Sequence, residues 1–328
     1  MTAPGDLVVA GESHNGANYD AFLMRTTAGG IPIWNWAYDN SSTWGPARDG
    51  FAALTEAVPF GSQITGDLVA VGRYTDQTVV DRQGLAARVD GNTGIIGAAP
   101  QCMAQHGGNP SEEFYFSVAQ LVTPPFAGQF VMVGATTLHP TWADDVWLTR
   151  GTPCFQVAQV RLGQSAGVTT EAGRDLREVL SPIGGGAAVG DLAITGYHGP
   201  TGGASRDAFL LLVRPGNLFP VFGNLYGDHA LNNEIGVSLA QIPAGVPPGF
   251  IIAGTTPTDW AGAGDPSDLF LVNTDAAGHS RCDHPWLPNP VNLNWGSVLL
   301  SPSLRSPVQS FPVASLHLPV AAPWLVCP

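Results

Sequence analysis

A seven-residue phrase that ends in glycine recurs along this 328-residue chain at a nearly constant spacing. It reads GDLVVAG at 5–11, GDLVAVG at 66–72, GQFVMVG at 128–134, GDLAITG at 190–196 and, one residue shorter, GFIIAG at 249–254. The closing glycines stand 61, 62, 62 and 58 residues apart. A fixed period of this length indicates a repeat architecture, so we expect one structural unit built five times.

Each period contains four short segments that are typical of β-strands, and no long amphipathic helix. The glycine phrase is followed by a segment that opens with Asp, then by a turn containing Gly and a third, often aromatic, strand. The Asp-led segments begin at Asp20, Asp81, Asp145, Asp207 and Asp268. A fourth strand follows a variable polar loop near Gly50, Glu113, Arg174, Glu234 and Asn294. Five such units predict an all-β, five-bladed β-propeller of four-stranded blades.

We expect the five repeats to form a single domain rather than several separate ones. Their expected limits are 5–65, 66–127, 128–189, 190–248 and 249–309, followed by a tail at 310–328. We expect the fourth strand of each unit to be the innermost of a blade. The strand near Asn294 would then join residues 5–38, so that N-terminal strands complete the last blade and close the ring. The tail is either a closing strand or the remnant of a sixth blade.

The order of the segments resembles that of a known repeat. VVAG at 8–11, DDVWL at 144–148 and Trp34 match bacterial propeller repeats of the VAG…D-x-W-L…W type, and more distantly kelch repeats. The kelch double glycine is a single glycine here, and the DGGY element of such repeats survives only as DGF at 49–51. The resemblance implies a kelch-like propeller and a binding or structural module, because fold alone does not specify function.

Composition excludes several classes of partner. The net charge is −13, and all thirteen cationic side chains are Arg; such a surface repels phosphate backbones, which argues against nucleic acid. No apolar run is long enough for a membrane span. The four cysteines lack CxxC spacing, and we expect the disulfides Cys102–Cys154 and Cys282–Cys327 in an extracellular or cell-envelope setting, with a leader removed or absent from this numbering. A cytoplasmic protein with free thiols is the alternative.

Two repeated columns have chemical interest. The Asp column is expected to be structural, with each carboxylate accepting backbone N–H bonds, because equivalent residues of five blades lie too far apart for acid–base catalysis. A second column in the inner strands is expected to form a polar ring around a solvated channel. It contains Glu56, Gln120, Glu178, Gln241 and Ser301. A structural cation such as calcium in this channel is an open alternative, and no other cofactor is expected.

The best candidate binding surface is the face that carries the loops entering the inner strands and the loops after the glycine strands, because functional side chains concentrate on such loops. Its candidate residues are Trp44, His106, Trp142, His198, Asp228, His229, Trp260, His284 and Trp286. We expect a non-catalytic protein that binds another protein, as part of an extracytoplasmic assembly. A glycan-binding propeller is one alternative, and a five-bladed glycoside hydrolase using Glu56 and Glu178 is another.

Overall fold

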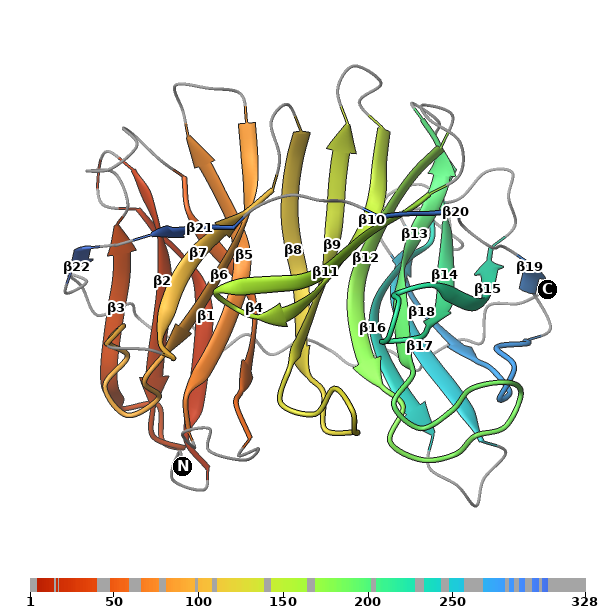
Figure 1. Ribbon diagram of the computed structural model, residues 1–328, viewed down its shortest axis with the longest axis horizontal. Coiled ribbons are helices and arrows are strands. Elements are labelled where there is room, and N and C mark those ends of the chain that lie inside the picture. The colour runs from red at the N-terminus through yellow and green to blue at the C-terminus, as the bar shows by residue number, and fades with distance from the viewer. Residues whose placement is uncertain are drawn as a thin grey trace.

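The computed structural model is an all-β structure, and every regular element among the described residues is a strand (Figure 1). It describes residues 5–14, 16, 18–39, 48–58, 66–76, 81–97, 100–107, 111–138, 143–163, 169–201, 205–227, 233–242, 248–256, 268–280, 283–285, 289–292, 297–300 and 303–305. Within these ranges no helix has the length and apolarity that crossing a bilayer requires.

The strands form five antiparallel sheets that follow one another along the chain. The first contains β1 (Leu7–His14), β2 (Tyr19–Thr26) and β3 (Pro32–Asp39). The second contains β4 (Gly50–Glu56), β5 (Leu68–Asp76), β6 (Asp81–Val89) and β7 (Cys102–His106). The third contains β8 (Ser111–Gln120), β9 (Phe130–Leu138), β10 (Ala143–Thr152) and β11 (Phe155–Gly163). The fourth contains β12 (Thr169–Glu178), β13 (Leu192–Pro200), β14 (Asp207–Val213) and β15 (Pro220–Tyr226), and the fifth contains β16 (Ile235–Ile242), β17 (Gly249–Thr256) and β18 (Asp268–Asn273).

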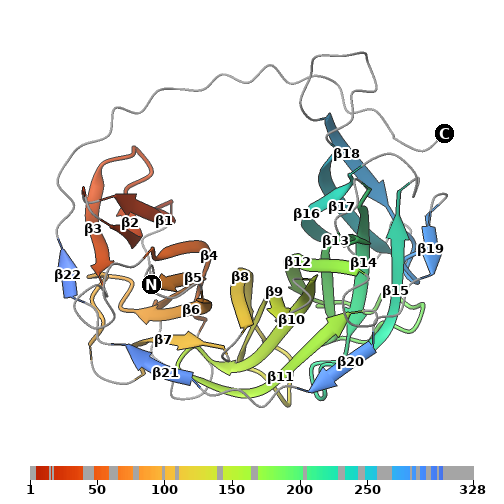
Figure 2. The ribbon, with the colours of Figure 1, turned by 90° about the horizontal axis from the view of Figure 1, so that it is seen from above.

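The five sheets are arranged around an arc, as seen from above in Figure 2. The strands β4, β8, β12 and β16, which we call the inner strands, line the inside of the arc, and β3, β7, β11 and β15 lie outside. The prediction of an all-β chain with five antiparallel units is therefore confirmed, and the fifth unit contains three described strands where four were expected. Among the described strands, none pairs the first sheet with the fifth.

The apolar core lies between neighbouring sheets rather than in one central mass. Each interface has its own cluster: for example, Leu23 and Leu68 belong to the cluster between the first two sheets, and Met132 belongs to the one between the second and third. Sheets in the middle of the arc are covered on both faces, so their strands read as continuous apolar runs. β14 is the clearest case, since all seven of its residues are buried.

The C-terminal strands run back along the outside of the arc, from the fourth sheet to the first. β19 (Asp283–Pro285) pairs with β15, β20 (Asn289–Asn292) with β11, β21 (Ser297–Leu300) with β7 and β22 (Ser303–Arg305) with β3. We call these four strands the outer belt. They cover sheet edges whose backbone groups would otherwise be unpaired.

The outer belt corrects one expectation. The segment near Asn294 was expected beside β1 as an inner strand, whereas residues 297–300 pair with the outer strand β7. Connection length explains the difference: four residues separate β20 from β21, and an extended chain gains at most about 3.5 Å per residue. The next outer edge along the arc lies within that reach.

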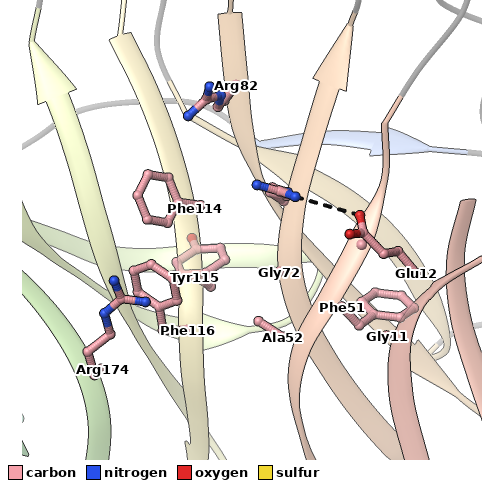
Figure 3. A pocket seen from close by; sticks show the side chains of 12 residues that line it. Gly11, Glu12, Phe51, Ala52, Gly72, Arg82, Phe114, Tyr115, Phe116 and Arg174 are labelled. Carbon is pink, nitrogen blue, oxygen red and sulfur yellow. Dashed lines mark ion pairs between the residues drawn. The ribbon is translucent and has the colours of Figure 1, made fainter. Parts of the chain in front are cut away.

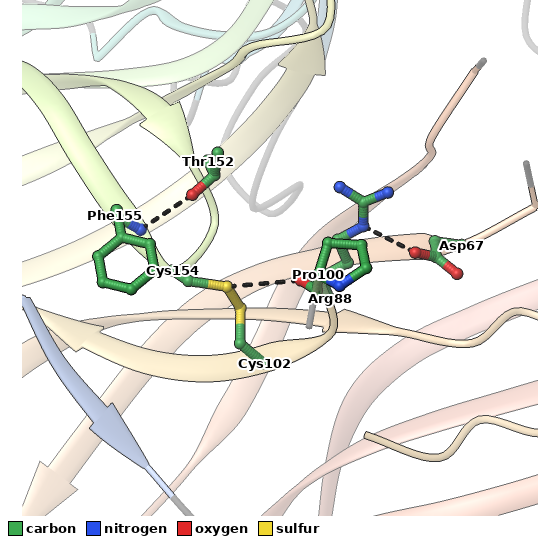
Figure 4. Close-up of a disulfide and its surroundings, with 7 residues drawn as sticks. All are labelled: Asp67, Arg88, Pro100, Cys102, Thr152, Cys154 and Phe155. Carbon is green, nitrogen blue, oxygen red and sulfur yellow. Dashed lines mark hydrogen bonds and ion pairs between the residues drawn. A yellow bond between two sulfur atoms is a disulfide. The ribbon is translucent and has the colours of Figure 1, made fainter. Parts of the chain in front are cut away.

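A disulfide joins Cys102 in β7 to Cys154 in the turn before β11, with the two Cα atoms 6.0 Å apart (Figure 4). This confirms the predicted pair, which connects the outer strands of adjacent sheets. Cys282 and Cys327 of the other predicted pair lie outside the described residues.

Candidate binding cleft

A β-bulge occurs at the same place in all four inner strands. The extra residues are Ala52 in β4, Phe116 in β8, Arg174 in β12 and Val237 in β16. Each lies one residue after the partner of a closing glycine: Gly72 pairs with Phe51, for example, immediately before Ala52. A bulge inserts one unpaired residue and redirects its side chain. The repeat therefore presents one variable side chain per sheet at the inside of the arc.

The bulge explains why the phrase ends in glycine. A Cβ atom on Gly72 would overlap the carbonyl oxygen of Gly50, and one on Gly134 would overlap that of Phe114. The same holds for Gly196 against Ala172 and for Gly254 against Ile235. At each of these glycines the backbone of the neighbouring strand comes too close for a side chain.

Three of the four bulged residues, Ala52, Phe116 and Arg174, line a cleft of about 330 Å³ on the inner side of the first four sheets (Figure 3). Its walls come from β1, β4, β5, β6, β8 and β12. They include Gly11, Glu12, Phe51, Ala52, Arg73, Arg82, Phe114, Phe116 and Arg174. Three arginines and one carboxylate thus face a small space in a chain whose net charge is −13.

The aromatic wall of the cleft is built by alternation along β8. Phe114 and Phe116 are partly exposed and contact each other edge to face, with ring centroids 4.7 Å apart. Tyr115, between them, is buried and stacks on Trp147 with centroids 4.4 Å apart. The buried ring fixes the strand against the second sheet, and the two phenylalanines remain available on the other side.

Arg174 lies against this wall. Its guanidinium carbon is 3.8 Å from the centroid of the Phe116 ring and 5.6 Å from that of Tyr197, distances at which a cation is attracted to an aromatic face. Arg206 covers the same Tyr197 ring at 4.4 Å. Burial lowers the pKa of Arg174 and raises that of Tyr197. The Arg174 guanidinium still carries its positive charge at neutral pH.

Glu12, on the opposite wall, is paired with arginines. It lies 3.0 Å from Arg48 and 3.6 Å from Arg73, and the hydrogen bond from Arg48 is the main cause that lowers the pKa of its carboxyl group. Arg82 is 3.5 Å from Glu112. With Glu12 neutralised by two partners, the lining carries an excess of positive charge that suits an anionic group.

His106, expected on the exposed face, is fully buried. Its Nδ1 is 2.9 Å from the hydroxyl oxygen of Tyr115, which also accepts hydrogen bonds from Thr149 and Gln156. Burial lowers the pKa of His106 to about 3, so the ring is neutral and shares a hydrogen bond with the Tyr115 hydroxyl through Nδ1. Strand β7 directs the His106 side chain into the core, where its contact with Tyr115 of β8 joins the second and third sheets.

His198, a second expected surface residue, lies near the end of β13 and bonds Glu171 through its Nδ1 at 2.8 Å. Glu171 is fully buried and neighbours Asp145 of the Asp column. Burial, with help from Glu171 and Asp144, raises the pKa of Asp145 to about 7, against the opposing effect of Arg161. This cluster joins the third and fourth sheets, and His198, Glu171 and Asp145 are not among the residues that line the cleft. In the described part of the chain, no set of three or more His, Cys, Asp or Glu is arranged to hold a metal ion.

The expected channel ring makes contacts between sheets. Gln120 accepts a hydrogen bond from the backbone N–H of Val58 at 2.6 Å and donates one to its carbonyl at 3.1 Å. Gln241 binds the backbone of Leu180 and Ser181 in the same manner. Glu178 instead accepts two N–H groups, from Val122 and Thr123, at 2.6 and 2.9 Å.

We call these three side chains the clamps, because each fastens the end of an inner strand to the preceding sheet. Their chemistry follows the backbone they meet: an amide faces one N–H and one carbonyl, and a carboxylate faces two N–H groups. Glu56 occupies the equivalent place in β4 and is exposed, and Ser301 lies outside the described residues. Glu178, one of the two carboxylates required by the glycosidase alternative, is thus engaged in a structural contact.

Most other expected loop residues lie beyond the part of the chain that the structure describes. Trp44, Trp142, Asp228, His229, Trp260 and Trp286 lie outside the described residues, and only the backbone of His284 is described, in β19. The cleft residues Phe116 and Arg174 were not predicted. A signal was available, because the bulge column lies four residues before the column that contains Gln120 and Glu178.

Comparison with protein-family models and with curated proteins finds no match to this chain. The geometry of the cleft therefore carries the functional argument.

Proposed function

We propose that this chain is a non-catalytic binding protein, a kelch-like five-bladed β-propeller, that engages another protein through the cleft at the inside of its sheets. The supporting observation is the column of bulged residues. A regular scaffold holds Ala52, Phe116 and Arg174 at equivalent places, and these residues differ where the surrounding scaffold repeats. Variable side chains on a fixed frame are typical of recognition surfaces.

The composition of the cleft favours a protein partner with an acidic group. Arginine and aromatic side chains dominate the energetics of protein interfaces, and the lining contains both kinds. The Cys102–Cys154 disulfide supports a location outside the cytoplasm, where such bonds persist, and hence a role in an extracytoplasmic assembly.

A glycan is the second candidate, because Phe114 and Phe116 provide partly exposed rings beside Arg174. An acidic sugar could stack on the rings and bind the guanidinium. The two candidates are distinguished by what the purified protein retains.

Native mass spectrometry of the protein isolated from its source provides the test. We expect a stoichiometric complex with another chain, and we expect Arg174→Glu to lose that chain. Arg214→Glu is the matched control, since Arg214 is exposed in the turn after β14. Retention of the partner by the Arg174→Glu variant would contradict the proposal. A bare wild-type monomer that binds acidic glycans on an array would support the second candidate.

A further inference from the structure

The first sheet differs from the other four because none of the described strands lies at its inner edge. Its strand β1 carries nearly the same phrase as β5, LVVAG against LVAVG. Leu68 and Ala70 of β5 are 1% and 0% exposed, whereas Leu7 and Val9 at the matching places in β1 are 56% and 45% exposed. Leu68 and Ala70 pack in the cluster between the first and second sheets, so the exposure of Leu7 and Val9 shows that no described sheet covers the corresponding face of the first sheet.

Gly11 shows a second contrast, at atomic detail. A Cβ atom on the closing glycine of β5, β9, β13 or β17 would overlap a carbonyl oxygen of the bulged inner strand. A Cβ atom on Gly11 would meet nothing within 4 Å. The phrase therefore retains a glycine that only a bulged neighbour requires, at the one sheet where the described strands supply no such neighbour.

The position of β1 makes this comparison direct. β1 packs on β4 as β5 packs on β8, β9 on β12 and β13 on β16. The first sheet therefore stands in the same relation to its neighbour as the others, and its inner edge offers backbone groups to one further antiparallel strand. Within the described residues, the C-terminal strands pair only with outer strands.

The cleft reaches this edge, since Gly11 and Glu12 belong to its lining. A strand paired with β1 and bulged opposite Gly11 would project its extra side chain towards the cleft, as Phe116 and Arg174 do from their strands. The lining there carries Arg73, Arg82 and Arg174, of which Arg73 is paired with Glu12 and Arg82 with Glu112. An acidic side chain at the bulge complements that charge.

We propose that the inner edge of β1 is a strand-acceptor site for one extended segment of a partner protein, antiparallel to β1 and carrying Asp or Glu at a bulge opposite Gly11. Strand addition of this kind obtains affinity from main-chain hydrogen bonds and specificity from alternate side chains. The inference rests on the proposed binding function and states how the partner is held.

The test uses the full-length protein and labelled peptides copied from its own inner strand β16, residues 233–242. Three forms differ at the bulge: the native peptide with Val237, Val237→Glu and Val237→Arg. We expect the Val237→Glu peptide to bind about fivefold more tightly than the native one, which corresponds to about 1 kcal/mol for one partly screened charge contact. The Val237→Arg peptide should bind most weakly, and the differences should shrink at high salt. Hydrogen exchange should slow at residues 7–14 when peptide is bound.

The Gly11→Val substitution should block the strand-acceptor site, because the new side chain would occupy the position opposite the bulge. It should leave the stability of the free protein unchanged, because a Cβ atom on Gly11 meets nothing within 4 Å. We expect at least a tenfold loss of peptide binding with an unchanged unfolding midpoint, while Ser13→Val on the same strand retains binding. Unaltered binding by the Gly11→Val variant, or the absence of protection at residues 7–14, would overturn the proposal.

A strong loss of stability in the Gly11→Val variant would also overturn the proposal, because this result would mean that a strand already occupies the strand-acceptor site. Analytical ultracentrifugation then assigns the occupant to this chain itself or, if stability depends on concentration, to a second copy. The binding function fails separately. If the Gly11→Val variant still binds the native partner and the Arg174→Glu variant does not, the protein binds its partner through the cleft without strand addition.

Discussion

Replacing Gly134 by alanine tests whether the bulge is the reason for the repeated glycine. The new methyl group would overlap the carbonyl oxygen of Phe114 and approach the carbonyl carbon of Phe114 and the Cα atom of Tyr115. All three are backbone atoms, so no side-chain rotation relieves the overlap. Either β8 and β9 separate or the bulge at Phe116 is lost.

The magnitude combines two opposing effects. Inserting a methyl group into a packed site costs about 1–3 kcal/mol, and the backbone hydrogen bonds beside the bulge are strained or lost at about 1 kcal/mol each. Alanine gains about 0.5–1 kcal/mol over glycine by restricting the unfolded chain. We expect a net loss of about 2–3 kcal/mol in the free energy of unfolding.

Urea unfolding followed by tryptophan fluorescence measures this quantity, with m-values compared to confirm that the transition keeps its cooperativity. Gly11→Ala is the internal control, since its methyl group meets nothing within 4 Å, and we expect it to be neutral or slightly stabilising. The reasoning is refuted if Gly134→Ala lies within about 0.5 kcal/mol of the wild type.

Three further perturbations address the contacts between sheets. The Gln120→Glu substitution places a carboxylate against the Val58 carbonyl and should lower the free energy of unfolding by about 2 kcal/mol. The Glu56→Gln substitution, at the exposed equivalent place, should change the urea midpoint far less. Equal effects of the two substitutions would contradict the clamp assignment. Replacing Cys102 and Cys154 by serine opens a link across 52 residues and should cost up to about 4 kcal/mol by the loop-entropy relation, with an unchanged thermal midpoint as the adverse result. The folded pKa of Asp145 is raised to about 7 from an ordinary 3.8, so the folded state holds a proton that the unfolded chain has released, and stability should fall as pH rises between these values and then level off. Asp145→Asn should reduce that slope in urea midpoints measured from pH 4.5 to 7.5, and an unaltered slope would count against it.

The sequence predicted the structure correctly at positions where every repeat has the same steric requirement. The spacing of Gly72 and Gly134 predicted five antiparallel units, because a repeated steric requirement leaves a repeated residue. The pairing of Cys102 with Cys154 was favoured among the three pairings that four cysteines allow, because it joins adjacent units, and the structure contains it. The propeller closure remains a proposal.

The binding cleft was harder to predict because its residues are those that the repeat does not fix. Phe116 and Arg174 vary at a constant position, and such variation has the same appearance as neutral drift in one sequence. His106 was misjudged for the opposite reason: a polar residue before a loop favours exposure, yet the Tyr115 hydroxyl gives it a buried partner. The position of the outer belt depends on edges of distant sheets, which no local pattern encodes.

The outer belt has a consequence for how the protein is made. Ser303 pairs with Asp39, a separation of 264 residues, so the outer edge of the first sheet to leave the ribosome is covered only by the last described strand, β22. Until then β3, β7, β11 and β15 all present uncovered edges, which invite pairing between nascent chains. A stop codon before residue 283 would therefore leave four sheets vulnerable at once, and translation that stalls near the end should produce aggregates rather than a shortened, soluble product.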